Sequence, residues 1–162
     1  MKRPLPGGEL KDKMVISIGI NATRKKVAER LGNSVSFGTA IHAATCISKR
    51  AVIGEGTVVM AGVTVNADTR IGKHCIINTN ASIDHDCVLD DYVHISPNAT
   101  LSGDVHVGEG THIGAGASVI QGISIGKWCT IGAGAVIIKD IPDHVTAVGN
   151  PARIIKVKET GK

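Results

Sequence analysis

The sequence predicts an all-β fold, a parallel β-helix of hexapeptide repeats, preceded by a small strand-helix-strand piece. Every sixth residue from Ile41 to Ile137 is aliphatic, and the residue two places before each of these is small or medium-sized, with Ile123 the largest. A period of six fits neither a helix nor an alternating strand, so each hexad indicates one short strand and a turn. The chain also has 20 glycines and only three aromatic residues, which is typical of tight corners around a narrow core.

Three hexads are expected to close one triangular coil of 18 residues. Such coils bury their core only by stacking on their neighbours, so the repeat region should fold as one unit. The chain therefore divides into a partial α/β segment over residues 1–38, a β-helix over 39–148, and an exit motif with a basic tail over 149–162.

The residues before the coils contain signals for a loop, two strands and one helix. Asn21 is a plausible N-cap, and Gly32 is a stop signal for the helix. The expected elements are a loop over 1–12, a buried strand over Met14–Ile20, a helix over Ala22–Leu31 and a short strand over Ser34–Gly38.

Cysteine placement predicts a reducing compartment. Cys75, Cys87 and Cys129 occupy the small inward position of their hexads, where cysteine acts as a small hydrophobe, whereas Cys46 faces outward. The N-terminus has no apolar run typical of a secretory signal, and no segment is long enough to span a bilayer. We expect a soluble cytoplasmic protein that is not inserted in a membrane.

The net charge of +4 is mild, and its cations gather at the two ends of the chain. Most of them, Arg24 included, are expected to form a solvated surface. A polyphosphorylated ligand is the alternative at the C-terminal end, near Arg153, Lys156 and Lys158. Nucleic acid is a poor candidate partner, because almost no aromatic side chains are present to stack on bases.

Several motifs resemble those of a known family. Ile-Gly steps recur at the strand ends, the stretch Ile77 to Gly103 contains a His-Asp pair followed nine residues later by a second His, and Val148 to Arg153 reads VGNPAR. In these features the chain resembles the hexapeptide-repeat acetyltransferases of the sialic-acid O-acetyltransferase and UDP-bacillosamine N-acetyltransferase family. The resemblance implies a left-handed helix, acetyl-coenzyme A as co-substrate without a metal, a sugar or nucleotide-sugar acceptor, and a homotrimer with the coenzyme groove between subunits.

The N-terminal piece resembles the closing part of the Rossmann-like domain of that family. The family's glycine-rich strand-to-helix turn, which binds the nucleotide of the sugar substrate, has no counterpart here, because Gly7-Gly8 follows no predicted strand. Acetyl transfer is therefore expected from the coils, whereas recognition of a nucleotide is not implied. We expect UDP to bind weakly or not at all.

His85 is the candidate general base. An attacking amine or hydroxyl must lose its proton, and the pKa of histidine suits that task near neutral pH. His85 lies two positions past the inward Ile83, so burial in the core does not explain it. Asp86 can orient the imidazole and stabilise its protonated form, provided that the two residues lie at a corner.

Gly103 is the candidate for binding the oxyanion. It follows His85 by 18 residues and should lie one coil farther along, about 4.8 Å away. A glycine there allows a ligand to approach the backbone, and its N–H can stabilise negative charge on the thioester oxygen. The resemblance implies the same role.

The resemblance assigns further residues to the site. Asn78 matches an active-site asparagine, and His94 is placed beside the coenzyme. Ala115 and Ala133 match positions that contact the pantetheine arm, although small corner residues of a coil would look the same. Arg153 follows the exit motif, where it can meet the phosphates of the coenzyme.

Two other functions remain open from the sequence. Outward-facing His94, His106 and His112 could supply a zinc site like that of γ-type carbonic anhydrases, with His94 and His112 stacked on each other. A non-catalytic scaffold of assembling coils is the second. The other three histidines, His42, His74 and His144, are expected to be solvated.

Overall fold

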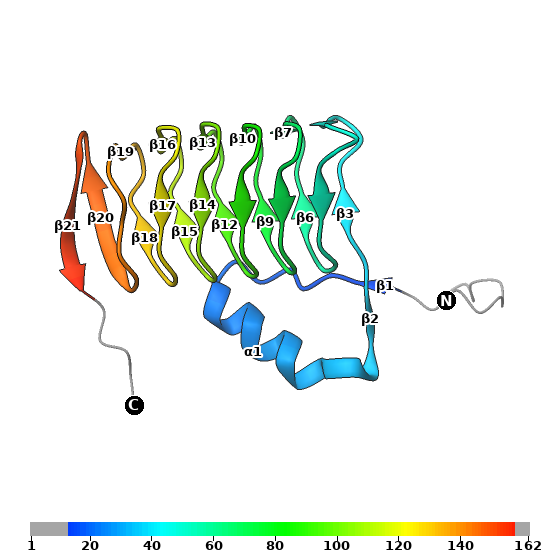
Figure 1. Cartoon of the computed structure of the whole chain (residues 1–162). Coiled ribbons are helices and arrows are strands. Elements are labelled where there is room, and N and C mark those ends of the chain that lie inside the picture. Colours follow the sequence, from blue (N-terminus) through cyan, green and yellow to red (C-terminus); the bar gives the residue numbers. More distant parts are fainter. Residues whose placement is uncertain (1–12, 158–162) are drawn as a thin grey trace, which may run out of the picture.

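The computed structural model describes residues 13–157 of the chain. Within this range the chain winds into stacked coils that form a left-handed parallel β-helix, and a single α-helix lies outside the coils (Figure 1). The expected fold class is therefore confirmed. The loop expected over residues 1–12, Gly7-Gly8 and Lys158 lie outside the described residues.

Three parallel sheets form the faces of the prism, and each hexad supplies one two-residue strand. Face 1 contains β3 (Ala40–Ile41), β6 (Val58–Val59), β9 (Ile76–Ile77), β12 (His94–Ile95), β15 (His112–Ile113) and β18 (Thr130–Ile131). Face 2 contains β4 (Cys46–Ile47), β7 (Thr64–Val65), β10 (Ser82–Ile83), β13 (Thr100–Leu101), β16 (Ser118–Val119) and β19 (Val136–Ile137). Face 3 contains β5 (Val52–Ile53), β8 (Arg70–Ile71), β11 (Val88–Leu89), β14 (His106–Val107) and β17 (Ser124–Ile125).

From β3 to β19 the register between coils is 18 residues, as the repeat predicts. Ser82 of β10 pairs with Thr100 of β13, for example. The chain passes from face 1 to face 2, then to face 3, and back to face 1. We call the three corners edge 1–2, edge 2–3 and edge 3–1.

The corners are tight turns whose second residue often has a positive φ. Glycine, asparagine and aspartate accept this left-handed conformation most readily, and they occupy most of these positions. Tyr92 (φ 62°) and Trp128 (φ 54°) are bulky exceptions, and both lie on edge 3–1. The surrounding structure must stabilise them there.

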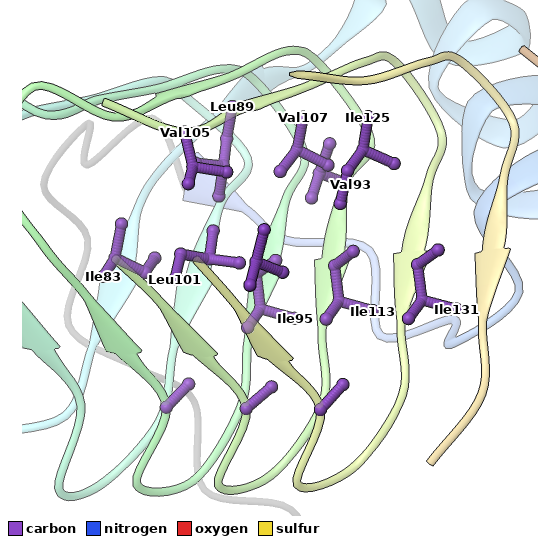
Figure 2. Close-up of a cluster of buried hydrophobic side chains, with 14 of the residues drawn as sticks. Ile83, Leu89, Val93, Ile95, Leu101, Val105, Val107, Ile113, Ile125 and Ile131 are labelled. Atoms are coloured by element: carbon purple, nitrogen blue, oxygen red, sulfur yellow. The ribbon is translucent and has the colours of Figure 1, made fainter. Parts of the chain in front are cut away.

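Aliphatic side chains fill the inside of the prism in ladders along its axis, as Figure 2 shows for Ile95, Ile113 and Ile131. Burial removes apolar area from water and is the main source of stability for such coils. Ile41 departs from the expected pattern, because it lies in the first coil and its side chain is 48% exposed. The hexad pattern predicts where a residue points, but it does not show that a coil covers it.

The inward cysteines behave as expected. Cys75, Cys87 and Cys129 are buried, and Cys46 is exposed. Burial raises the pKa of Cys75 to about 12, so its thiol stays protonated at neutral pH. These thiols serve as small core groups.

The N-terminal piece folds as β1 (Lys13–Met14), α1 (Asn21–Leu31), the 3-10 helix η1 (Gly32–Ser34) and β2 (Ser36–Phe37), with β1 parallel to β2. Two sequence predictions are wrong here. The strand ends at Met14 and both of its residues are exposed, because it pairs only with the two residues of β2. Asn21 is not the N-cap, since its side chain donates instead to the Gly110 carbonyl oxygen of edge 3–1.

A hairpin closes the C-terminal end of the prism. Strand β20 (Val145–Gly149) continues face 1 beside β18, and β21 (Ala152–Val157) pairs with it in antiparallel orientation. Within the described residues, no helix has both the length and the apolar composition that crossing a bilayer requires.

Candidate functional site

His85 and Asp86 form the turn of edge 2–3 that follows β10. Asp86 has a φ of 59°, and this left-handed turn residue brings two adjacent side chains to the same side of the chain. The His85 Nδ1 atom lies 2.8 Å from Asp86 Oδ2. The corner geometry that the sequence prediction required is therefore present, and the carboxylate can fix the ring with Nε2 available to accept a proton.

Acidic groups surround the His85 imidazole and raise its pKa. The largest cause is the hydrogen bond to Asp86, and the negative charges of Asp84 and Asp104 act in the same direction. Asp84 also accepts a 2.8 Å hydrogen bond from the His85 backbone N–H, which fixes the start of the turn. The raised pKa makes this imidazole a stronger base than an ordinary histidine.

Gly103 lies against the His85 ring in the next coil. The backbone N–H of Asp104 donates to the His85 carbonyl oxygen at 3.0 Å, which joins the two turns. A Cβ atom built on Gly103 would lie 2.6 Å from His85 Cε1 and 2.8 Å from Nε2. Only glycine leaves room for the ring in this position, and the Gly103 N–H makes no hydrogen bond within residues 13–157.

Asn78, Ala115 and Ala133 lie at edge 1–2, where β9, β15 and β18 end. Asn78 is half-buried, and its Oδ1 accepts a 2.8 Å hydrogen bond from the Thr79 N–H. The full width of face 2 separates this edge from His85. A single chain therefore does not bring these three residues together with the His-Asp pair.

His94 and His112 lie on face 1 and stack on each other, as the 18-residue spacing predicts. Their ring centroids are 4.6 Å apart and the ring planes differ by 11°. The pKa of His94 is lowered to about 4, first by burial and then by the positive charge of His112 and Arg24. His94 is thus neutral at physiological pH and able both to donate and to accept hydrogen bonds.

A groove of about 500 Å³ opens over this histidine pair. Gly19 and Ile20, which precede α1, and the first two residues of α1 form one wall, and the coils form the other. Its lining residues are Gly19, Ile20, Asn21, Ala22, His94, Gly110, His112, Trp128, Cys129 and Thr130. The volume falls in the usual range for a small-molecule site, and no acidic or basic side chain other than histidine and cysteine lines it.

Arg153 lies at the start of β21, at the C-terminal end of the prism, and its side chain is exposed. Its Nη1 donates to the Ala152 carbonyl oxygen at 2.8 Å. A small cavity of about 30 Å³ separates Ala152 and Arg153 from Lys139 and the isoleucines around it. This end of the chain therefore presents two cations close to each other.

His106 lies on face 3, away from the other two candidate metal ligands. Its Nε2 is 3.2 Å from Asp90 Oδ1. Within residues 13–157, no three His, Cys, Asp or Glu side chains are grouped so that they could hold a metal ion. The proposed trio of His94, His106 and His112 does not converge in one chain.

Two residues that were expected to be solvated are buried. Arg24 is 1% exposed, and His74 stacks on Tyr92 with 5.3 Å between ring centroids. The cause is α1, which packs along edge 3–1. Arg24 and Ala28 lie four residues apart on the buried side of α1, and no pattern in the sequence links that side to the coils. Of the other two histidines, His42 is exposed and His144 is half-buried.

Comparisons with known proteins agree with this architecture. A family model described as bacterial transferase hexapeptide (six repeats) matches residues 50–84, 68–103 and 104–139. No curated protein sequence matches the chain.

Three solved structures are similar over most of the chain. A mutant of perosamine N-acetyltransferase from Caulobacter crescentus, in complex with CoA and GDP-perosamine, is 41% identical, with 89% of this chain and 69% of that chain covered and a TM-score of 0.87. The acetyltransferase domain of PglB from Neisseria gonorrhoeae, in complex with acetyl coenzyme A, is 42% identical, with coverages of 88% and 70% and a TM-score of 0.86. WeeI from Acinetobacter baumannii is 33% identical, with coverages of 87% and 69% and a TM-score of 0.84.

Proposed function

The chain belongs to the bacterial transferase hexapeptide family, and on this premise we propose that it transfers an acetyl group from acetyl-coenzyme A to an amino or hydroxyl group of a sugar or nucleotide-sugar. The observation that carries the proposal is the position of the His85 ring, held by Asp86 and lying directly against Gly103. The imidazole of His85 and the backbone N–H of Gly103 thus lie on one edge of the prism, which supports a role for them as base and oxyanion donor.

His85 accepts the proton of the attacking amine or hydroxyl through Nε2 as the new bond forms to the thioester carbonyl carbon. The Gly103 N–H stabilises the negative charge that develops on the carbonyl oxygen. As the carbon–sulfur bond breaks, protonated His85 returns the proton to the departing thiolate, which balances the reaction. Asp86 stabilises the imidazolium through the whole cycle.

The coenzyme is proposed to run along edge 2–3 towards the C-terminal end. Ile120 and Ile138 occupy the same position in their coils as Asp84, two and three coils farther along. They are 39% and 42% exposed and form an apolar stripe beyond Gly103. Lys139 follows His85 by three coils, roughly 14 Å at about 4.8 Å per coil. An extended pantetheine arm has about the length of four residues, on the order of 14 Å. Its phosphates would then meet Lys139 and Arg153.

A homotrimer completes the proposal. Asn78, Ala115 and Ala133 lie on edge 1–2 and His94 lies on face 1, so a neighbouring copy must bring these residues to the His85 edge. Closed cyclic assemblies are the common way for identical chains to build such shared sites. Light scattering should therefore give the mass of three chains, and a monomer at micromolar concentration would contradict this part.

We place the protein in the cytoplasm, in the synthesis of modified sugars, because free buried thiols fit a reducing compartment. The test is to incubate purified protein with acetyl-coenzyme A and a panel of amino sugars, free and nucleotide-linked, and to identify acetylated product by mass spectrometry. Metal analysis of the same sample addresses the zinc alternative. Bound zinc without acetylated product, or neither, would contradict the proposal.

A further inference from the structure

Arg24 is a buried cation whose hydrogen-bond acceptors are all neutral. Its Nε donates to the His74 carbonyl oxygen at 2.7 Å, Nη2 to the Tyr92 carbonyl oxygen at 2.8 Å, and Nη1 to the Ile18 carbonyl oxygen at 2.9 Å. Burial lowers its pKa from the ordinary value. A buried charge costs stability unless its donors are satisfied, so this arrangement demands a specific geometry of the carbonyl groups.

The acceptors of Arg24 belong to separate parts of the chain. His74 and Tyr92 are corner residues of two successive coils on edge 3–1, whereas Ile18 lies in the segment that leads into α1. Nη2 also donates to Asn21 Oδ1 at 2.9 Å, and Asn21 in turn donates to the Gly110 carbonyl oxygen of a third coil at 2.9 Å. The guanidinium thus joins the N-terminal segment to two coils directly and to a third through Asn21.

The segment held by Arg24 is also the wall of the groove over the histidine pair. Gly19 to Ala22 line one side of that groove, and His94, His112 and Thr130 line the other. Figure 1 shows α1 lying along the prism beside the coils. Without Arg24, the hydrogen bonds to His74 and Tyr92 that hold this wall against the coils would be lost.

We propose that Arg24 is a positioning residue for acetyl transfer: it fixes residues 18–22 as the wall of the groove over His94 and His112, so that the N-terminal segment and the coils bind the acceptor sugar as one surface. This rests on the proposed function. The lining of the groove includes an indole, an amide and a hydroxyl group, so it can offer a sugar ring both an apolar surface and hydrogen bonds.

The charge of Arg24 gives the proposal a spectroscopic signature. The pKa of His94 is lowered by burial, by the stacked His112 and by Arg24, and the Gly19 backbone opposes this weakly. Loss of Arg24 removes the positive charge that acts on His94, so His94 should bind a proton at a higher pH.

The test is the Arg24→Gln variant of the full chain. We expect an acceptor KM raised on the order of tenfold or more, because hydrogen bonds to a charged group are lost. We also expect a smaller rise in the KM for acetyl-coenzyme A, which would meet this groove only at His94. In NMR titrations, His94 should take up its proton closer to the ordinary histidine value of about 6.5.

Lys26→Gln is the matched control, because Lys26 is a neighbouring cation on α1 that is exposed and lies outside the groove. It should leave both KM values and the His94 titration unchanged. Arg24→Lys keeps the charge but loses the fork of donors, so it supplies a second variant if Arg24→Gln does not fold. It should still raise the acceptor KM.

The outcomes separate the two proposals. An Arg24 variant that folds with the acceptor KM and the His94 titration of the wild type overturns the positioning role. If both variants failed to fold, Arg24 would be a structural residue and the proposal would be wrong. If the wild type acetylates no acceptor, the proposed function fails, whereas the His94 titration still decides whether Arg24 sets the environment of the groove.

Discussion

Replacing Gly103 by alanine should lower activity strongly and leave the fold intact. The added Cβ would lie 2.6 Å from His85 Cε1, whereas carbon atoms in contact prefer about 3.5–4.0 Å. The imidazole must therefore move by about 1 Å. A displacement of this size at a reacting group costs about 10²-fold in rate. The His85 side chain is 59% exposed, so it can move aside without disturbing the core.

The stability of Gly103→Ala should change by less than about 1 kcal/mol, which shifts Tm by no more than roughly 2–4 °C. Ala67 occupies the same corner position one coil before His85, which shows that this turn accepts alanine. The assay is steady-state thiol release from acetyl-coenzyme A, with Tm measured on the same samples.

A double-mutant cycle makes the test specific. In His85→Ala the ring is absent, so the added methyl group of Gly103→Ala meets nothing. The double variant should then be no slower than His85→Ala alone, a clear case of non-additivity between contacting residues. If Gly103→Ala kept the wild-type kcat, or if the two losses multiplied in the double variant, the contact between ring and glycine would not be what the catalytic step requires.

Three further predictions concern the pH profile, the core and the coenzyme. Since His85 must be unprotonated to act as base, activity should fall as pH drops through its raised pKa. Asp86→Asn removes the largest cause of that shift, so the acid limb of the kcat/KM profile should move to lower pH. An acid limb that did not move would contradict the assignment of His85 as base. Ile95→Ala should lower the free energy of unfolding, measured by chemical denaturation, by about 2–5 kcal/mol. Ile41→Ala should lower it much less, because Ile41 has the same hexad position but is 48% exposed. Equal losses would refute the argument that burial stabilises the coils. The double variant Lys139→Gln/Arg153→Gln should raise the KM for acetyl-coenzyme A but not the KM for acetyl-pantetheine. The rise should be clearest at low salt, because exposed charges are screened over about 8 Å at physiological ionic strength. An equal effect on both acetyl donors would place the phosphates of the coenzyme elsewhere.

The period of six was sufficient to predict the coils and part of the site. It gives the stacking of Gly103 on His85 and of His112 on His94, because both follow from an 18-residue coil alone. The place of His85 two positions after the inward Ile83 predicts that it lies outside the core, whereas its position with Asp86 at a corner is known only from the structure.

The contacts of α1 could not be predicted in the same way. Arg24 reaches His74 and Tyr92 across 50 and 68 residues, and no periodic signal links a helix to the edge on which it packs. The burial of His74 and the partner of the Asn21 side chain depend on that packing. The exposure of Ile41 has a similar origin, because a repeat pattern does not contain the information that the first coil is the end of the stack.

The most direct test of the central claim compares wild type and His85→Ala in thiol release from acetyl-coenzyme A at saturating acceptor, with coenzyme affinity measured by calorimetry. The account predicts acceptor-dependent thiol release by the wild type. In the variant it predicts a kcat lower by about 10²–10⁴-fold and an almost unchanged Kd for the coenzyme. A variant with the full wild-type kcat would show that His85 is not the base.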